Sequence, residues 1–430
     1  MRLRDRSLKR KLILATILFA GLSYPTLSES SPYYCDSENG GLAVPEGFCA
    51  RVFSKSTGPV RSLAIASNGD GFATIRSGVI RDGGVVSLRD NDGDMRADEV
   101  KRFGSGSGHG IALSKQFLYF ASHKSIVRWP WKVGQLVPSG PPETVVGGFP
   151  KQRSHKEKAL ALAPSGKLYV SVGAPSNACQ IRSRSRGSPG IDPCPQLELH
   201  AGIWLYDAFA TDQVHREQSR VATGLRHTLA MAIEPKTSDL WGAVNGRDQL
   251  GSLWGYSAKL NARLPAEELV RILPSSDFGW PYCYYDGNEQ EKVLSPEYGG
   301  DGSVTGRCDQ TKDPEFAFPA HWAPMGMTFY NGLSFPKRYH GGLFVAFHGS
   351  WNRSPLPQEG YQIAFVPFSA GGIKGGFETF AIGQKDFRKF RMTGVAVAPD
   401  GALFVADDST GTIWRIQRNE TTVKKRGKNG

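Results

Sequence analysis

Several features are scarce in this 430-residue sequence, and each scarcity argues against a class of protein. The apolar run near the N-terminus covers only residues 12–22, which is short for a membrane span. The six cysteines include no Cys-x-x-Cys spacing, which argues against a zinc site. Basic and aromatic residues do not interleave in one patch, which argues against nucleic acid as a partner. The formal net charge of +12 comes partly from the two ends of the chain.

The N-terminus has the layout of an export signal. A basic segment, residues 1–11, precedes the apolar run, so we expect a signal peptide or an uncleaved N-terminal anchor over residues 1–30. No clean small-x-small cleavage site follows, and no cysteine stands directly after the run, which argues against a lipid anchor. We expect one domain over residues 31–418, a basic disordered tail over 419–430, and a periplasmic or secreted protein.

The cysteines fall into three pairs that are close in sequence: Cys35 with Cys49, Cys179 with Cys194, and Cys283 with Cys308. Fifteen connectivities are possible in principle. The local pairing is the simplest, and with an export signal it indicates an oxidising compartment.

A strand-turn-strand unit recurs along the chain. In its clearest copy, apolar segments 159–163 and 168–172 flank a Pro-Ser-Gly turn. Similar units begin at residues 63, 111, 160, 231, 327 and 395, so the first two intervals are 48 and 49 residues and the later ones 71, 96 and 68. The short intervals suit one four-stranded blade, and the longer ones suit a blade with insertions. The sequence therefore predicts an all-β fold, a six-bladed β-propeller with loop insertions.

Polar residues precede the predicted inner strands: His109, His155, Arg226, His227, His321 and Arg391. A single histidine before a strand is more often structural than catalytic. In a propeller, however, the ends of the inner strands meet in one cup around the axis. Histidine there suits general base catalysis, and arginine suits an anionic ligand, so the cup is expected to hold a polyanionic cofactor beside a substrate hydroxyl.

Six segments carry a family resemblance: Gly224–His227, Val244–Gly251, Asp277–Cys283, His321–Met327, Phe347–Ser354 and Arg391–Gly401. Over roughly Val44 to Gln417 the chain resembles the glucose/sorbosone dehydrogenase family of pyrroloquinoline quinone (PQQ) enzymes, and most closely its sorbosone dehydrogenase-like branch. The resemblance implies a six-bladed propeller with PQQ on the axis and calcium beneath it.

The same resemblance implies roles for individual residues. His155 occupies the position of the base that takes the substrate's hydroxyl proton, and Arg226 that of the arginine beside the quinone carbonyls. Arg391 and Arg353 resemble partners of the PQQ carboxylates, which Lys389 could assist. Two further residues are assigned to cofactor binding, namely His227 and Asn177.

The calcium region is expected at Asn245–Asp248. The backbone carbonyls of Gly246 and Arg247, with the Asp248 carboxylate, would be ligands, and hard oxygen donors suit calcium. Here the chain departs from its relatives, because sorbosone-type proteins carry Glu at the position of Gly246. Glucose-type enzymes carry Asn where this chain has His227. The insertion over residues 173–195 also differs from glucose-type loops and should alter the substrate.

A separate acidic segment, Asp90–Glu99, has the alternating carboxylates of a calcium loop. The twelfth position is Lys101 where an EF-hand has Glu. Two readings stay open, a structural calcium turn between blades and a solvated acidic hairpin.

The main functional hypothesis is a PQQ-dependent dehydrogenase that oxidises a sugar, aldose or aldehyde hydrate and passes electrons to an external acceptor. The alternatives are a calcium-dependent lactonase-like hydrolase and a propeller that only binds glycans or partners. Arginine and histidine in the cup favour the dehydrogenase, because a lactonase centre would need a carboxylate and amide cluster around its metal.

Overall fold

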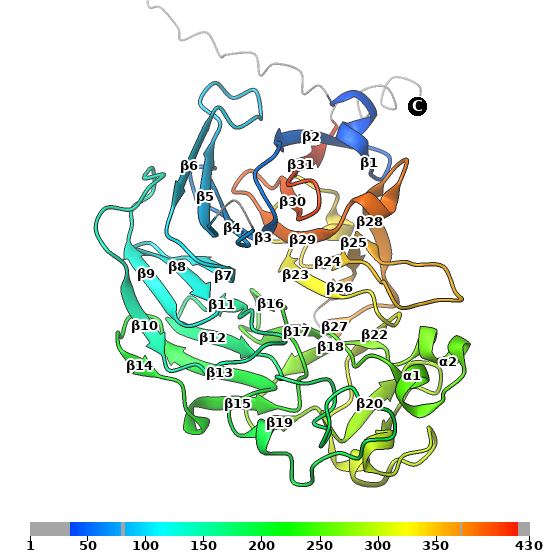
Figure 1. Ribbon diagram of the computed structural model, residues 1–430. Helices are drawn as coiled ribbons and strands as arrows, with labels where there is room; N and C mark the ends of the chain where they lie inside the picture. The colour runs from blue at the N-terminus through cyan, green and yellow to red at the C-terminus, as the bar shows by residue number, and fades with distance from the viewer. Residues whose placement is uncertain (1–34, 79–81, 370–371, 420–430) are drawn as a thin grey trace, which may run out of the picture. The chain divides into compact units, whose positions relative to one another are not determined.

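Short strands and tight turns make up nearly all of the described chain (Figure 1). The computed structural model describes residues 35–78, 82–369 and 372–419, all within one compact unit, residues 34–430. The expected signal segment and all but the first residue of the expected tail lie outside the described residues. No helix in the described ranges is long and apolar enough to cross a membrane.

Six antiparallel sheets follow one another along the chain, which confirms the predicted six-bladed propeller. The first blade consists of β3 (Val60–Ile65), β4 (Gly71–Ile75), β5 (Gly84–Arg89) and β6 (Glu99–Phe103). The second consists of β7 (Gly108–Leu113), β8 (Phe117–Ser122), β9 (Ile126–Pro130) and β10 (Glu143–Gly147), with β14 (Gln213–Val214) parallel at its edge. The third consists of β11 (Leu160–Leu162), β12 (Lys167–Val172), β13 (Gly202–Asp207) and β15 (Arg220–Thr223), with β19 (Ser276–Asp277) parallel at its edge.

The remaining three blades follow the same order. The fourth consists of β16 (Ala230–Ile233), β17 (Leu240–Val244), β18 (Glu267–Ile272) and β22 (Phe316–Phe318). The fifth consists of β23 (Pro324–Phe329), β24 (Leu343–His348), β25 (Tyr361–Val366) and β28 (Glu378–Gly383), and β1 (Leu42–Ala43) extends it. The sixth consists of β29 (Met392–Val397), β30 (Leu403–Asp407), β31 (Ile413–Arg418) and β2 (Phe48–Ser54).

The ring closes because strands from both ends of the propeller domain pair in the sixth blade. β2, from the start of the domain, pairs antiparallel with β31 from its end and so completes the last blade. The inner strands contact one another in the cyclic order β3, β7, β11, β16, β23, β29 and back to β3. This closure leaves no open edge between the first and last blades.

Apolar side chains fill the spaces between neighbouring blades. Six hydrophobic clusters lie one between each pair of successive blades, the sixth blade and the first included. Trp204 and Trp414 are buried in two of these clusters. Several middle strands are buried along nearly their whole length, because neighbouring blades cover both faces of each sheet.

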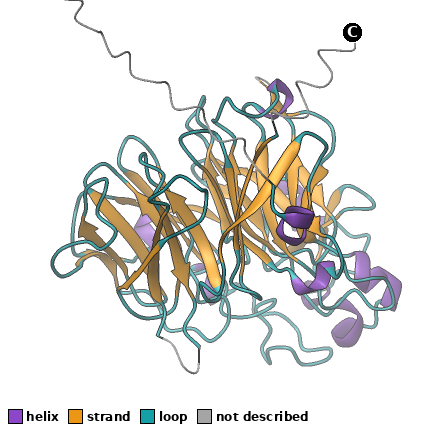
Figure 2. Cartoon of the chain, turned by 90° about the horizontal axis from the view of Figure 1, so that it is seen from above, coloured by secondary structure: helices purple, strands orange, loops and turns teal. Residues whose placement is uncertain are grey.

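Insertions extend several of the blades. The insertion after β17 carries α1 (Leu250–Trp254) and α2 (Ala258–Arg263), and the hairpin of β20 (Cys283–Asp286) and β21 (Glu291–Leu294) follows β19. Figure 2 shows these helices gathered at one edge of the strand-built body. A further small hairpin joins β26 (Phe368–Ser369) to β27 (Gly372–Ile373). The described 3₁₀ turns are Ser37–Gly41, Pro195–Leu197, Glu217–Ser219, Pro296–Tyr298, Gly306–Gln310, Lys337–Tyr339 and Phe387–Lys389.

The three predicted disulfides are present. Cys35 is bonded to Cys49, Cys179 to Cys194 and Cys283 to Cys308, so the local pairing is confirmed. All six cysteines are disulfide-bonded, so none of them is a free thiol that could bind zinc. The second bridge closes the insertion of the third blade beside the cup.

Candidate active site

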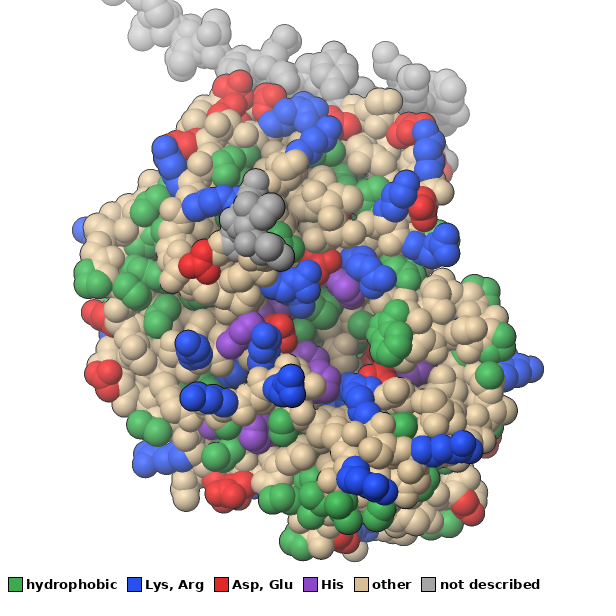
Figure 3. Space-filling view, in the orientation of Figure 1, with side chains coloured by type: hydrophobic (Ala, Val, Ile, Leu, Met, Phe, Trp, Pro, Cys, Tyr) green, Lys and Arg blue, Asp and Glu red, His purple; other side chains and the backbone are tan. Residues whose placement is uncertain are grey.

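One end of the propeller axis carries a cup lined by histidines and arginines. In the face shown in Figure 3, histidine and basic side chains gather around a central hollow. His155, Arg226, His321 and Arg391 come from loops that precede inner strands, as predicted. His109 lies within β7 rather than before it. Two of these loop histidines, His155 and His321, have left-handed backbone conformations, with φ of 50° and 67°; such strain in non-glycine residues is concentrated at functional sites.

His155 and His227 form a stacked pair in the cup. Their ring centroids are 4.6 Å apart and their planes are inclined by 30°. Gly173, just after β12, makes this pair possible, because a Cβ there would come within 2.7 Å of both the His155 Cβ and the His227 Nδ1. The Nδ1 of His227 is buried and has no hydrogen-bond partner among the described residues.

The hydrogen bonding of His155 determines which of its nitrogens is free. Its Nδ1 lies 2.7 Å from the carbonyl oxygen of Ala174, so Nδ1 carries the proton and donates it there. Nε2 is then the basic nitrogen. Burial, and next the charge of Arg226, lower the pKa of His155 to about 3. The ring therefore stays neutral, and able to accept a proton, over the whole physiological range.

Arg226 is the centre of a second group, the Arg226 cluster, which consists of Asn177, Arg226, Asn245, Gly246 and Asp248. The guanidinium donates to the Gly246 carbonyl at 2.7 Å, to the Asn177 Oδ1 at 3.0 Å and to the Asp248 Oδ2 at 3.2 Å. Asn177 in turn binds the backbone of Asp248 through both ends of its amide. Five residues from three separate segments of the sequence thus form one hydrogen-bonded unit.

Further cations and an amide surround Asp248. Its Oδ1 accepts a hydrogen bond from the Asn352 Nδ2 at 3.1 Å, and Arg184 of the disulfide-closed insertion reaches its Oδ2 at 3.3 Å. Burial alone would raise the pKa of Asp248, but Arg226, Arg184 and His321 hold it below the ordinary value. The carboxylate is ionised, and the insertion that the sequence placed beside the cup does contact it.

The opposite side of the cup holds a group that sequence reasoning missed, the Asp408 cluster of Arg61, His348, Arg391 and Asp408. Asp408 accepts from Arg61 NH1 at 2.6 Å and from His348 Nε2 at 3.0 Å. Arg391 NH1 lies 3.3 Å from His348 Nδ1. Burial opposes ionisation, yet His348 and Arg61 hold the pKa of Asp408 below its ordinary value. His348 lies inside one of the family motifs, and Asp408 directly follows β30. Their positions at strand ends were the only sequence feature that could have indicated that they line the cup.

Glu267 is a second residue that the sequence did not single out. It is buried at the start of β18, where one carboxylate oxygen accepts from the Gly246 N–H at 2.7 Å and the other from the Ala323 N–H at 3.0 Å. Burial raises its pKa to about 7. Glu267 therefore ties the loop of the expected calcium region to the loop before β23.

Gly246 is the position where sorbosone-type relatives carry Glu. A Cβ here would approach the Pro265 ring to 2.9 Å and the Ala266 carbonyl oxygen to 3.2 Å. Close packing of this neighbouring segment explains why the chain has glycine at this position.

His109 closes the cup toward the axis. It is buried at the mouth of a channel of about 330 Å³ that all six inner strands line. Burial and the charge of Arg61 lower its pKa to about 3. Nearby Glu157 lies 3.7 Å from His123, and that contact keeps the pKa of Glu157 well below its ordinary value despite burial.

Three predicted site residues point away from the cup. The buried guanidinium of Arg353 donates to the Pro357, Ala262 and Ala320 carbonyls and pairs with Glu359 at 2.9 Å. The side chain of Lys389 is 72% exposed and lies 3.8 Å from Asp386. Arg247 directs its guanidinium to the buried Glu297, so only its carbonyl could face a metal.

The residues present fit a polyanionic quinone. Arg226 and Arg391 place positive charge on both sides of the cup, and the buried Nδ1 of His227, unpartnered among the described residues, is a polar atom left for a ligand. They also fit a hard cation in donor type, since the oxygens of Gly246 and Asp248 converge. Both oxygens are engaged by Arg226, so a calcium ion would have to replace those hydrogen bonds.

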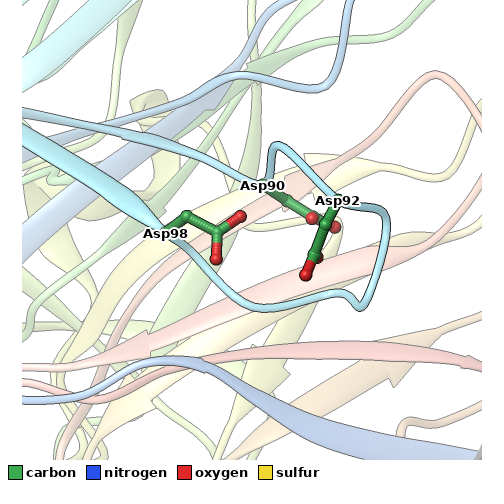
Figure 4. Close-up of side chains that lie close together, drawn as sticks. All are labelled: Asp90, Asp92 and Asp98. Carbon is green, nitrogen blue, oxygen red and sulfur yellow. The ribbon is translucent and has the colours of Figure 1, made fainter.

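The acidic hairpin lies apart from these groups, between β5 and β6. Figure 4 shows Asp90, Asp92 and Asp98 around one loop, with one oxygen of each within 4.8 Å of the others. Each carboxylate also accepts a backbone N–H of the same loop. These bonds account for the loop's conformation without a metal, and both readings of this segment stay open.

Comparison with known proteins agrees with the fold and the motifs. A calcium structure of a Trichoderma reesei protein of Carbohydrate-Active Enzymes Family AA12 superposes with a TM-score of 0.73 at 21% identity, covering 88% of this chain and 97% of that one. A PQQ-dependent pyranose dehydrogenase of Coprinopsis cinerea is 27% identical over 276 residues, 54% of this chain and 37% of the relative. An uncharacterized protein of Borreliella burgdorferi is 30% identical over 284 residues, 61% of this chain and 66% of the relative.

The relatives from Coprinopsis cinerea and Borreliella burgdorferi are matched over only part of their own lengths, whereas one family model matches nearly the whole propeller. That model, described as TrAA12-like, covers residues 42–419. The resemblance to PQQ-dependent sugar dehydrogenases that the motifs predicted is confirmed. With blade order, cup and motifs in agreement, the chain belongs to the TrAA12-like family.

Proposed function

We propose that this protein is a PQQ-dependent dehydrogenase that oxidises the hydroxyl-bearing carbon of a sugar, an aldose or a related aldehyde hydrate. The observation that carries the proposal is the state of His155. Its Nδ1 is committed to the Ala174 carbonyl, its Nε2 is free, and its ring is kept neutral beside Arg226. An imidazole with no proton on Nε2 can accept one from a substrate hydroxyl, while burial and the neighbouring cation make it a weaker base than free imidazole.

The chemistry divides between the residues and the quinone. His155 takes the hydroxyl proton on Nε2 while the C–O single bond of the substrate becomes a C=O double bond. PQQ, when bound, supplies the two-electron acceptor for the hydride that leaves the same carbon, and an external acceptor later removes those electrons. Arg226 provides positive charge for oxygen that becomes negative during this step. Arg391 would pair with a quinone carboxylate, while Arg353 and Lys389 would have to turn from their present partners to do so.

Calcium would be held by the carbonyls of Gly246 and Arg247 and by the Asp248 carboxylate. Glu267 would support this loop from behind through the Gly246 N–H. An ion there would add positive charge beside Arg226 and make the cup more receptive to an anionic cofactor.

One observation favours the lactonase-like alternative. The structure brings the amides of Asn177 and Asn352 to Asp248, which is part of the carboxylate and amide cluster that such a centre requires. The centre of this cluster is a guanidinium group, however, and not a set of oxygen atoms free to bind a metal. Arg226 therefore favours the dehydrogenase.

The test is reconstitution. The full chain would be incubated with PQQ and calcium, and reduction of an artificial dye would be followed with a panel of aldoses. PQQ-dependent turnover with at least one aldose is expected. Absence of turnover together with absence of a quinone absorbance shift would refute the dehydrogenase, and calcium-dependent lactone hydrolysis without PQQ would favour the alternative.

A further inference from the structure

A groove of about 360 Å³ lies beside the cup, and none of the roles inferred above for cofactor or metal residues uses it. Its walls come from α1, α2 and the loop that carries Trp351. Its volume is in the usual range of ligand pockets, roughly 300–1,000 Å³. Figure 1 shows α1 and α2 outside the ring of blades, next to β20.

Trp351 is the most conspicuous residue of this groove. Its side chain is 67% exposed, although a tryptophan of a soluble protein usually contributes to the core. The residues on either side are engaged, since Ser350 is buried and Asn352 binds Asp248. The loop is therefore held in place while it presents an open indole ring to solvent.

The rest of the groove is polar but uncharged. Among the described residues that line it, none is Asp, Glu, Lys, Arg or His. The exposed hydroxyls of Ser252 and Ser354 have no hydrogen-bond partner within the described ranges, and the Gln249 amide uses only its oxygen, toward Arg184. An aromatic face with neutral hydrogen-bonding groups suits a neutral, polyhydroxylated ring better than a phosphate or a peptide carboxylate.

The groove is connected to the cup by the hydrogen bonds of Asn352. This side chain lines the groove, donates to Asp248 of the Arg226 cluster at 3.1 Å and lies 3.4 Å from His321 Nδ1. Asn261, also in the groove, accepts from His321 Nε2 through its carbonyl at 2.8 Å. A ligand in the groove would therefore touch residues that also contact the Arg226 cluster.

We propose that this groove binds the second ring of a short oligosaccharide whose terminal sugar enters the cup. The apolar face of that ring would stack on Trp351, and its hydroxyls would meet Ser252, Ser354 and Gln249. The substrate class is then an oligosaccharide with an oxidisable end. This inference rests on the proposed function for the terminal sugar, but the groove itself can be tested without turnover.

The test is isothermal titration of the full chain, without PQQ, using glucose, xylose, cellobiose, maltose and xylobiose as probes. At least one disaccharide is expected to bind about tenfold more tightly than its monosaccharide. Trp351→Ala should abolish this advantage, whereas Trp351→Phe should keep most of it because an aromatic ring remains. Leu333→Ala, at a side chain that is 83% exposed outside the groove, is the matched control and should keep it all.

The outcomes separate the groove from the chemistry. Equal affinities for mono- and disaccharides, no binding of any probe, or an advantage that survives in Trp351→Ala would each overturn the groove proposal. A disaccharide advantage that is lost in Trp351→Ala while the PQQ-loaded enzyme turns over no sugar would support the groove and refute the dehydrogenase. A thermal melt of each variant shows whether it is folded. If Trp351→Ala does not fold, the test uses Trp351→Phe and a Ser252→Ala, Ser354→Ala double variant. The double variant is expected to weaken disaccharide binding selectively.

Discussion

The two sides of the cup use charge in different ways. In the Arg226 cluster one buried cation gathers oxygen atoms from several loops, and the histidines beside it are kept neutral. In the Asp408 cluster one buried carboxylate gathers cations, and His348 donates to it. The first side is suited to accept a proton, and the second is suited to hold fixed charge.

This difference indicates that proton transfer belongs to the side of Arg226 and anion binding to the side of Asp408. Burial, and next the charge of Arg226, lower the pKa of His155, so its Nε2 carries no proton before the substrate arrives. On the other side Arg391 is half-buried and only loosely bonded, with donor distances of 3.3 to 3.5 Å to His348 and Gly349. Such a side chain can change partners at small cost, which suits an arginine that meets an incoming anion.

The largest expected effect concerns His155. His155→Ala should lower turnover by roughly two to four orders of magnitude, the usual range for loss of a general base, while PQQ affinity changes little. Initial rates of dye reduction at saturating aldose measure this. His340→Ala, at a histidine that bonds the Phe335 carbonyl in the fifth blade, serves as the control and should retain normal rates. Equal turnover in His155→Ala would remove this residue from the mechanism.

The next expected effect compares the two arginines in stability. Arg226→Gln leaves Asp248 and several carbonyls without their buried cation, so the free energy of unfolding should fall by about 3–5 kcal/mol. Arg391→Gln, at a half-buried and loosely bonded side chain, should cost about 1 kcal/mol or less. Urea unfolding of the apo-protein measures both. If the two losses were equal, the distinction between the sides of the cup would fail.

A smaller effect is expected from pH. Burial lowers the pKa of His109 and His155 to about 3, and that of His227 well below its ordinary value. The unfolded chain takes up these protons near pH 6.5 and the folded chain does not, so stability should decrease as pH falls from 6.5. Asp408 loses its contribution only as pH falls through the carboxylate range. Glu267, whose pKa burial raises to about 7, acts in the opposite direction between pH 7 and 5, so a histidine variant is needed to isolate the histidine contribution.

Urea midpoints at pH 7 and pH 5 test this, with His227→Asn as the comparison because it removes one of the three imidazoles. A lower midpoint at pH 5, and a smaller difference in His227→Asn, are expected. An equal pH 7-to-5 difference in His227→Asn and in the unmodified chain would show that His227 takes up its proton in the folded state as readily as in the unfolded state.

The smallest expected effect is at Lys389. Its side chain is 72% exposed, and its contact with Asp386 is a weak surface pair. Lys389→Ala should change both stability and PQQ affinity less than Arg391→Gln does. Titration of each variant with PQQ provides the measurement. A larger loss of affinity in Lys389→Ala would mean that this lysine turns into the cup when the quinone binds.

Much of the fold could be predicted from sequence because blades are local in the chain. Six apolar units with short turns indicated six blades, and loops before inner strands indicated where His155, Arg226 and Arg391 would meet. Partners distant in sequence could not be predicted. Asp408 and Arg61 are 347 residues apart, and Glu267 supports Gly246 through a backbone N–H, which leaves no signal in residue type.

The direction in which a side chain points could not be predicted from the sequence either. The motif around Arg353 gave no indication that three carbonyls and Glu359 would occupy its guanidinium. Likewise, nothing in the sequence distinguished the open indole of Trp351 from the buried one of Trp322, which stands in a neighbouring motif. These differences come from packing, and only the assembled ring determines them.

The central claim is that the cup binds PQQ between its two cationic sides. Its most direct test is a titration of the calcium-supplemented apo-protein with PQQ, followed by the absorbance of the quinone. The account predicts saturable binding of one PQQ per chain, weakened at least tenfold in Arg391→Gln. Absence of a saturable absorbance change, or identical binding by Arg391→Gln and the unmodified chain, would contradict it.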